Sequence, residues 1–414
     1  MNAGNPPWLL PLVVLLGGLL GRLLTAATLR LLGVLDEAGP SELRGEAAEA
    51  RPMAAGELAR AARRPGRGPA GWIPVAGWWL ARGPRPVGWR SAAAVEALAI
   101  ASAVAAWWWT AGLGMQLPEA VAALPEARAG IPARLVAHLV LFAFLAAAVW
   151  IDLRHRLIPD SVTVPGTLLG MLVVGLVPEV LLPVTCLEPR DHAAARAVAD
   201  VLGALGPLGC GSPGWISRWP GLAVCLLAFT AWWSVGTAAT PGRFDLRRLI
   251  LSAGLAAVIV VWWFAGNEPS RRHAAVLASL AGSVISGGLV LLTREGASRA
   301  LGREAMGMGD VTLMAMVGSW LGWQAGVAAF FIAAFLGLAH GGLGWLAHRD
   351  NELPYGPSLA AATVLVLCGW RPLAAWMEPW LARPLELLGV LLLMVALTAV
   401  SLALWSRLRA RRPL

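Results

Sequence analysis

The sequence predicts an all-α fold, a polytopic bundle of transmembrane helices, and three observations support this prediction. Of the 414 residues, 58% are hydrophobic and only 14% are charged, and the mean hydropathy is +0.67. A water-soluble globule of this size has too little interior to bury so much apolar surface. The apolar residues also collect in long runs, and a helix needs roughly 20 such residues to cross a bilayer.

These runs predict about eleven spans under the rule of roughly 20 residues per crossing. They lie near residues 8–29, 92–113, 132–151, 161–183, 220–239, 249–265, 273–293, 311–323, 325–347, 358–373 and 385–405. The span at 311–323 is too short to cross a bilayer without tilt, so we expect other helices to enclose it.

Arginine sets the predicted orientation, because the chain has no Lys and its formal net charge of +9 comes from Arg. Residues 33–90 contain nine arginines, namely Arg44, Arg51, Arg60, Arg63, Arg64, Arg67, Arg82, Arg85 and Arg90, whereas the loop at 114–132 contains only Arg128. Loops rich in basic residues stay in the cytoplasm. We therefore expect the N-terminus outside and the C-terminus in the cytoplasm. The charge marks a lipid membrane as a partner, and no basic motif with interleaved aromatics indicates a nucleic acid.

Asp310 is the first candidate functional residue. It follows Gly307-Met308-Gly309 and stands directly before an apolar run. A charged side chain costs at least ~2.5 kcal/mol at the centre of a bilayer, so a carboxylate at the mouth of a membrane helix is a functional candidate. The glycines let the backbone bend and approach another segment. Taken alone, the motif favours a second interpretation, in which Asp310 is the N-cap of its helix.

Asp152 is the second candidate, at the end of the third predicted span, and Asp160 follows Pro159 at the start of the next. By themselves these acids also fit a solvated turn. The arginine distribution, however, places Asp152 and Asp310 at the same membrane face. Two carboxylates close together cannot both ionise, so they share one proton. The ionised acid can then take a proton from water while the protonated one polarises a peptide carbonyl.

Such an acid pair needs neither a metal ion nor a cofactor, and the sequence contains no His-Cys ligand cluster, no HExxH and no GxSxG motif. His138 is isolated within an apolar span, where a histidine that is hydrogen-bonded in the helix bundle is the favoured interpretation over a metal ligand. We therefore expect no metal site.

Three motifs in this order, IDLRHRLIPDSVTVPG, EAMGMGDVTLMAMVGSWLGW and LPYGP, resemble those of the bacterial type IV prepilin peptidases, the GxGD class of intramembrane aspartyl proteases. The resemblance implies that Asp152 and Asp310 are catalytic. It implies supporting roles for Asp160, Gly307, Gly309, Pro354 and Gly356. It further implies a multi-pass protein of the bacterial cytoplasmic (inner) membrane that cleaves the short basic leader of type IV prepilins or type II secretion pseudopilins after Gly at the cytoplasmic face.

The chain departs from the family pattern in three places. In the first helix, Arg22 and Thr25 stand where the family usually has Ser and Asn, and the cytoplasmic loop lacks the two Cys-x-x-Cys pairs, which excludes a zinc tetrad there. Many members also N-methylate the new N-terminus with S-adenosylmethionine, and the sequence leaves open whether this chain does. The two acids are 158 positions apart (310 − 152), more than is typical of the family.

The resemblance divides the chain into six segments. They are a first transmembrane helix (1–33), a cytoplasmic loop of degenerate methylase type (34–91), helices with the first catalytic Asp (92–183), an inserted loop with extra helices (184–272), peptidase helices with the GxGD motif (273–373), and an extra C-terminal helix with a basic tail (374–414). Whether Cys186 and Cys210 pair in the inserted loop is open.

The alternative function is a non-enzymatic membrane assembly component or a proton-coupled transporter. A transporter is expected to carry its acids in the middle of broken helices. Here both acids lie at predicted helix ends, which favours the peptidase.

Overall fold

The computed structural model describes residues 9–22, 89–118, 128–183, 223–224, 226–227, 229–231, 271–302, 304–348, 355–381, 389–390 and 393. Within this part every regular element is a helix, in agreement with the predicted all-α fold. The elements are the helix Leu9–Arg22, α4 (Trp89–Trp107), the π-helix η3 (Trp108–Gly112), α7 (Ile131–His155), α8 (Asp160–Leu176), the 3₁₀ turn η4 (Pro178–Val180), α12 (Arg271–Leu301), α13 (Met308–Leu321), α14 (Trp323–His348), α15 (Gly356–Cys368) and α16 (Trp370–Leu381).

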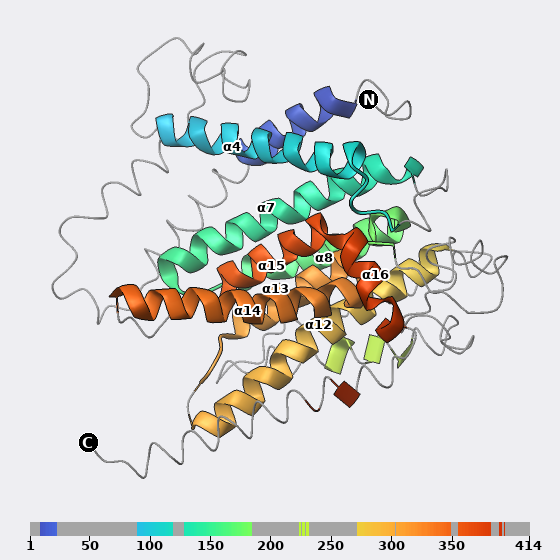
Figure 1. Cartoon of the computed structure of the whole chain (residues 1–414). Coiled ribbons are helices and arrows are strands. Elements are labelled where there is room, and N and C mark those ends of the chain that lie inside the picture. The colour runs from blue at the N-terminus through green and yellow to red at the C-terminus, as the bar shows by residue number, and fades with distance from the viewer. Residues whose placement is uncertain are drawn as a thin grey trace.

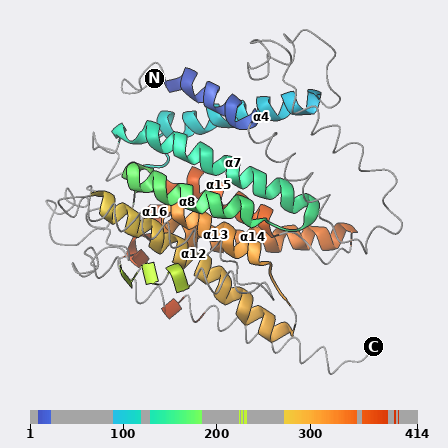
Figure 2. The ribbon, with the colours of Figure 1, turned by 180° about the vertical axis from the view of Figure 1, so that it is seen from behind.

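The helices form a layered bundle with α13 near its centre (Figure 1). The N-terminal helix and α4 lie along one side, α7 comes next, and α12 lies on the opposite side, an order that the view from behind repeats (Figure 2). Around α13 pack α12, α8, α14, α15 and α7. Segments distant in sequence thus meet on one short helix.

The helix α13 has 14 residues, which at about 1.5 Å per residue gives a length well below the ~30 Å of a bilayer's hydrocarbon core. All its residues from Leu313 to Leu321 are buried. The expectation that the short span at 311–323 is enclosed by other helices is therefore confirmed.

Small and polar groups hold α13 against its neighbours. Gly318 of α13 lies directly against Gly282 of α12, so that a side chain at either position would meet the backbone of the other. Trp320 Nε1 donates a hydrogen bond of 2.9 Å to the Gly166 carbonyl of α8. Close backbone approach is a common basis of helix association in membranes. These contacts therefore hold α13 against α12 and α8.

The N-terminal helix packs on α4 through an ion pair. Arg22 Nε lies 3.0 Å from Glu96 Oε1, and the Glu96 side chain is only 2% exposed. Arg22 is one of the two positions at which the sequence departs from the family's first helix. Its guanidinium here offsets the charge of a buried carboxylate that would otherwise be costly among apolar helices.

One predicted span is wrong, because the chain bends within it. The run at 358–373 was expected to cross as one helix, but α15 ends at Cys368 and the following helix turns away by 87°. Gly369 begins the turn, and Trp370 Nε1 donates to the Pro183 carbonyl at 2.7 Å, while the Arg371 N–H donates to the Met115 carbonyl at 2.9 Å. These two bonds hold the new direction.

Two described helices are long and apolar enough to cross a membrane, Ile131–His155 and Ala275–Arg299, and the bent pair Gly356–Cys368 and Trp370–Met377 adds a third if it counts as one span. The spans expected at 249–265, and most of those at 220–239 and 385–405, lie outside the described residues, as do Cys186, Cys210 and the loop at 34–88. The total of about eleven spans, their orientation and the six segments stay predictions.

Candidate active site

Asp152 lies near the end of α7, and the local sequence explains why the helix stops there. Arg156, the residue after α7, adopts a left-handed conformation (φ 54°), and its N–H bonds to the Asp152 carbonyl. Pro159 then caps α8, which begins at Asp160. Asp152 is 5% exposed. The helix end thus places a buried carboxyl beside an extended connection, as the sequence predicts.

Asp310 lies in the first turn of α13 and is 8% exposed. The N-cap of α13 is Gly307, not Asp310, so the interpretation of Asp310 as the N-cap is wrong. Its carboxyl still accepts a hydrogen bond from the Gly307 N–H. This is the arrangement of a capping box, in which the third helical residue reaches back to the N-cap backbone. Asp310 can therefore accept this hydrogen bond at the start of its helix and also have a role in an acid pair.

The two carboxyls lie within electrostatic reach of each other. Asp152 acts electrostatically on Asp310, although the two residues belong to different helices and different motifs. The Gly356 N–H, at the start of α15, donates to Asp152, while Asp152 Oδ2 is buried without a hydrogen-bond partner among the described residues. A buried oxygen left unpaired is costly, and a shared proton or a water molecule would satisfy it.

Ile158 joins the three motif segments. A methyl group at Gly309 would lie 2.7 Å from the Ile158 carbonyl oxygen, and one at Gly356 would lie 2.9 Å from Ile158 Cδ1 and 2.5 Å from Asp152 Oδ2. Only residues without a side chain allow this approach. Sequence reasoning named Gly309 and Gly356 but missed Ile158, because its neighbours along the chain do not reveal what packs on it.

Tyr355 is a second site residue that sequence reasoning missed. Burial, and then the negative charge of Asp310, raise the pKa of Tyr355 to about 12, so its hydroxyl stays protonated and lies within electrostatic reach of that acid. Its ring packs on Gly337 of α14. A signal was available, since this is the single Tyr of the chain and it stands within LPYGP.

The structure describes two of the other three residues that were predicted to support the site. Gly307 is exposed, and Asp160 is half-buried as the first residue of α8. Pro354 lies outside the described residues. The roles assigned to these three residues stay predictions.

His138 lies far from the acids along α7 and is bonded at both ring nitrogens. Nε2 is 3.0 Å from the Val180 carbonyl, so it carries the proton, and Nδ1 accepts from the Gln116 amide at 3.3 Å. The interpretation of His138 as a hydrogen-bonded bundle residue is confirmed. Among the described residues, no three His, Cys, Asp or Glu side chains gather to hold a metal ion.

Two buried carboxyls within electrostatic reach of each other at the ends of apolar helices define a class, namely helical membrane proteins with an acid pair. Comparison with known families narrows it. The model of the type IV leader peptidase family matches residues 139–197 and 222–342, two segments that contain Asp152 and Asp310. Over these residues the chain is similar to this family.

Curated relatives match over part of the chain. Proteins named "Prepilin leader peptidase/N-methyltransferase" are 36% identical over 97 residues in Aeromonas hydrophila (22% of this chain, 33% of the relative) and 32% identical over 180 residues in Burkholderia pseudomallei (43% and 52%). One from Dickeya chrysanthemi is 42% identical over 77 residues (17% and 27%). The chain thus spans about a quarter to a half of the length of these relatives. No solved structure matches.

Proposed function

We propose that this chain is a prepilin leader peptidase, an aspartyl endopeptidase of the bacterial cytoplasmic membrane with Asp152 and Asp310 as its catalytic acids. The observation that carries the proposal is that the two buried carboxyls lie within electrostatic reach of each other, with Gly309 and Gly356 packed around Ile158. The family match and the printed names of the relatives support the same reaction. The transporter alternative is less supported, because both acids lie within four residues of a helix end.

In the proposed reaction, one carboxylate takes a proton from a water molecule held between the acids, and the water oxygen forms a bond to the scissile carbonyl carbon. The other, protonated acid hydrogen-bonds the carbonyl oxygen as charge develops there. The tetrahedral intermediate then breaks its C–N bond, and a proton passes from the acid pair to the leaving nitrogen. Two mutually repelling carboxyls suit this chemistry, because their charges favour the state with one proton between them.

The proposed substrate is a type IV prepilin or type II secretion pseudopilin, cut after the Gly that ends its basic leader at the cytoplasmic face. A peptide must be extended to present its carbonyl to the acids. Gly307 is exposed at the start of α13, next to Asp310, and a backbone without side chains leaves room for such a segment. The orientation that we predict from the arginine distribution puts this end of the bundle in the cytoplasm.

The test is cleavage of a purified prepilin by the protein in detergent or in proteoliposomes. Asp152→Asn and Asp310→Asn keep the size of each side chain and remove its acid, so each is expected to lower kcat/KM by a factor of roughly 10³ or more. Glu179→Gln, at an acid on η4 beside Arg134 near the start of α7, is the matched control and should cleave normally. Wild-type rates from either Asn variant would refute the assignment of the acid pair.

Methylation of the new N-terminus is a separate activity. The relatives' printed name includes it, but residues 34–88, the greater part of the segment predicted to be of methylase type, lie outside the described and the matched residues. The described residues give no observation that assigns a site for S-adenosylmethionine. We therefore propose only the peptidase, and mass spectrometry of the mature pilin with added S-adenosylmethionine reads out methylation in the same assay.

A further inference from the structure

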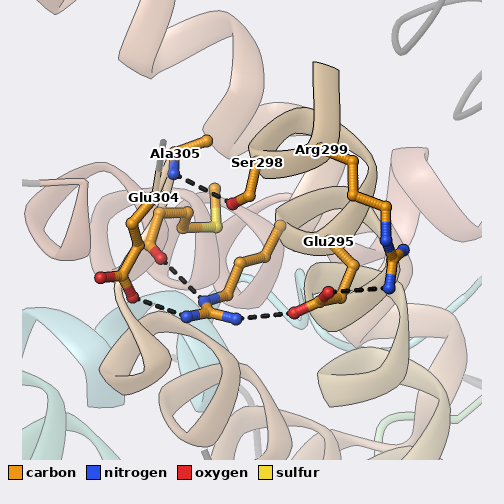
Figure 3. Close-up of polar contacts among 7 residues, drawn as sticks. Glu295, Ser298, Arg299, Glu304 and Ala305 are labelled. Atoms are coloured by element: carbon orange, nitrogen blue, oxygen red, sulfur yellow. Dashed lines mark hydrogen bonds and ion pairs between the residues drawn. The ribbon is translucent and has the colours of Figure 1, made fainter. Parts of the chain in front are cut away.

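Arg294, on α12, uses all three of its guanidinium nitrogens to bind its neighbour Glu295 and two residues just before the GMGD segment, Glu304 and Met306. Nε donates to the Met306 carbonyl at 2.9 Å, Nη1 to Glu295 Oε1 at 2.8 Å, and Nη2 to Glu304 Oε1 at 2.6 Å. Figure 3 shows Glu295 and Glu304 reaching the guanidinium group from opposite sides. The Arg294 side chain is 13% exposed, so its charge is held in a mostly desolvated position where its interactions are strong.

The Met306 carbonyl and the Gly307 N–H belong to one peptide group. Arg294 binds the carbonyl, and the N–H on the opposite edge donates to the carboxyl of Asp310. Since a peptide unit is planar, a cation that fixes its carbonyl also fixes the direction of its N–H. Hydrogen bonds in such a chain polarise one another, so the bond from Arg294 strengthens the one to Asp310.

A second contact holds the same segment independently of Arg294. The Ala305 N–H donates to Ser298 Oγ at 3.1 Å, and Figure 3 shows this bond beside the charged cluster. Arg299 forms an ion pair with Glu295 at 3.0 Å at the edge of this cluster, and its side chain is 76% exposed. The segment thus keeps one tether without Arg294, and α12 carries a second arginine that is suited to serve as a control.

We propose that Arg294 is a positioning residue for Asp310, acting through the Met306–Gly307 peptide to orient the acid and to favour its ionised form. This inference rests on the proposed function, because it assigns Arg294 a part in the same acid pair. The titratable groups that face Asp310 directly are Asp152 from α7 and Tyr355 from the start of α15. Arg294 is not one of these direct neighbours, and it acts on Asp310 through the Met306–Gly307 peptide group.

The first test compares Arg294→Gln, Arg294→Lys and Arg299→Gln in prepilin cleavage, with the amount of folded protein measured for each. Arg294→Gln should lower kcat/KM about tenfold or more, as expected for the loss of a charge-assisted hydrogen bond, with most of the loss in kcat. Arg294→Lys should recover part of the rate, because it keeps the charge but not the fork of donors. Arg299→Gln should behave like the wild type.

The second readout is the pH profile, which a merely structural role would not move. A hydrogen bond to the ionised form favours that form. Its weakening lets Asp310 keep its proton to higher pH, so the limb of the profile that reports Asp310 should move upward by about half a unit. A lower rate with an unshifted profile in Arg294→Gln would mean that Arg294 only tethers the segment, and the inference would be overturned.

The third readout does not depend on cleavage. A diazo reagent esterifies a protonated carboxyl, with the proton passing to the diazo carbon, the carboxylate oxygen bonding to that carbon, and nitrogen leaving. Labelling of Asp310, followed by peptide mass spectrometry against pH, should persist to higher pH in Arg294→Gln than in the wild type or Arg299→Gln. Identical labelling curves refute the inference, whereas shifted curves in a protein that does not cleave prepilin would refute the proposed function alone.

Discussion

The carbonyl oxygen of Ile158 lies so close to Gly309 that a methyl group at Gly309 would stand 2.7 Å from it. The two residues belong to different motifs, 151 positions apart (309 − 158). Their contact sets how far α13 can approach the α7–α8 connection, and therefore where Asp310 stands relative to Asp152.

Gly309→Ala should therefore inactivate the protein more than it unfolds it. Overpacking against a backbone atom costs ~1–3 kcal/mol, and a displacement of the acid by about 1 Å can cost roughly a factor of 10² in rate. Gly288→Ala on α12 is the comparison, because nothing lies within 4 Å of its added methyl group. Cleavage rates per folded protein measure the difference, and equal rates in the two variants would show that the Ile158 contact is not critical.

Gly356→Ala tests the second glycine that packs on Ile158. The added methyl group would lie 2.5 Å from Asp152 Oδ2, which forces the carboxyl or the start of α15 to move. We expect a loss of roughly 10² in kcat/KM with a smaller effect on thermal stability. Gly288→Ala on α12 is the control, since nothing lies within 4 Å of its added methyl group. A Gly356→Ala variant as active as Gly288→Ala would contradict the predicted geometry.

The acid pair also predicts a bell-shaped dependence of kcat/KM on pH. At low pH both carboxyls are protonated and neither can accept a proton from water, whereas at high pH both are ionised and neither can support the carbonyl oxygen. Helical content recorded by circular dichroism at each pH would show that the protein stays folded. A rate that rises steadily to high pH would point to a single base and exclude a shared proton.

His138→Leu should lower stability without changing the chemistry. The substitution removes the partner of the Val180 carbonyl and of the Gln116 amide, and each buried polar group left unpaired costs ~1–3 kcal/mol. The histidine lies in the part of α7 opposite to Asp152. We expect a lower thermal midpoint in detergent and a normal kcat for the folded fraction. A kcat reduced at full folding would indicate coupling between the two ends of α7.

The sequence predicted much of the fold because length and hydropathy report burial directly. The runs at 132–151 and 273–293 became α7 and α12 with small shifts at their ends. Hydropathy carries no direction, so the bend after Cys368 was missed, although Gly369 and Pro372 stand there as a signal. Both acids were found because a charge beside an apolar run is rare.

The supporting contacts of the site could not be predicted in the same way. Ile158 contacts Gly309 through its carbonyl oxygen and Cβ and Gly356 through Cδ1, and Arg294 binds a backbone carbonyl. Nothing in the sequence around Ile158 or Arg294 marks either residue for such a contact. An arginine near the end of a helix ordinarily compensates the helix dipole, so only the folded structure distinguishes Arg294 from Arg299.

The packing of Gly309 and Gly356 on Ile158 also bears on when the protein can become active during its synthesis. Asp152 and Asp310 leave the ribosome well before Gly356, whose N–H binds Asp152 and whose backbone packs on Ile158. A nascent chain that ends before α15 contains both acids but lacks one wall of the site. On the proposed function, proteolysis therefore begins only after α15 has been inserted, which protects neighbouring nascent membrane proteins from a half-built protease.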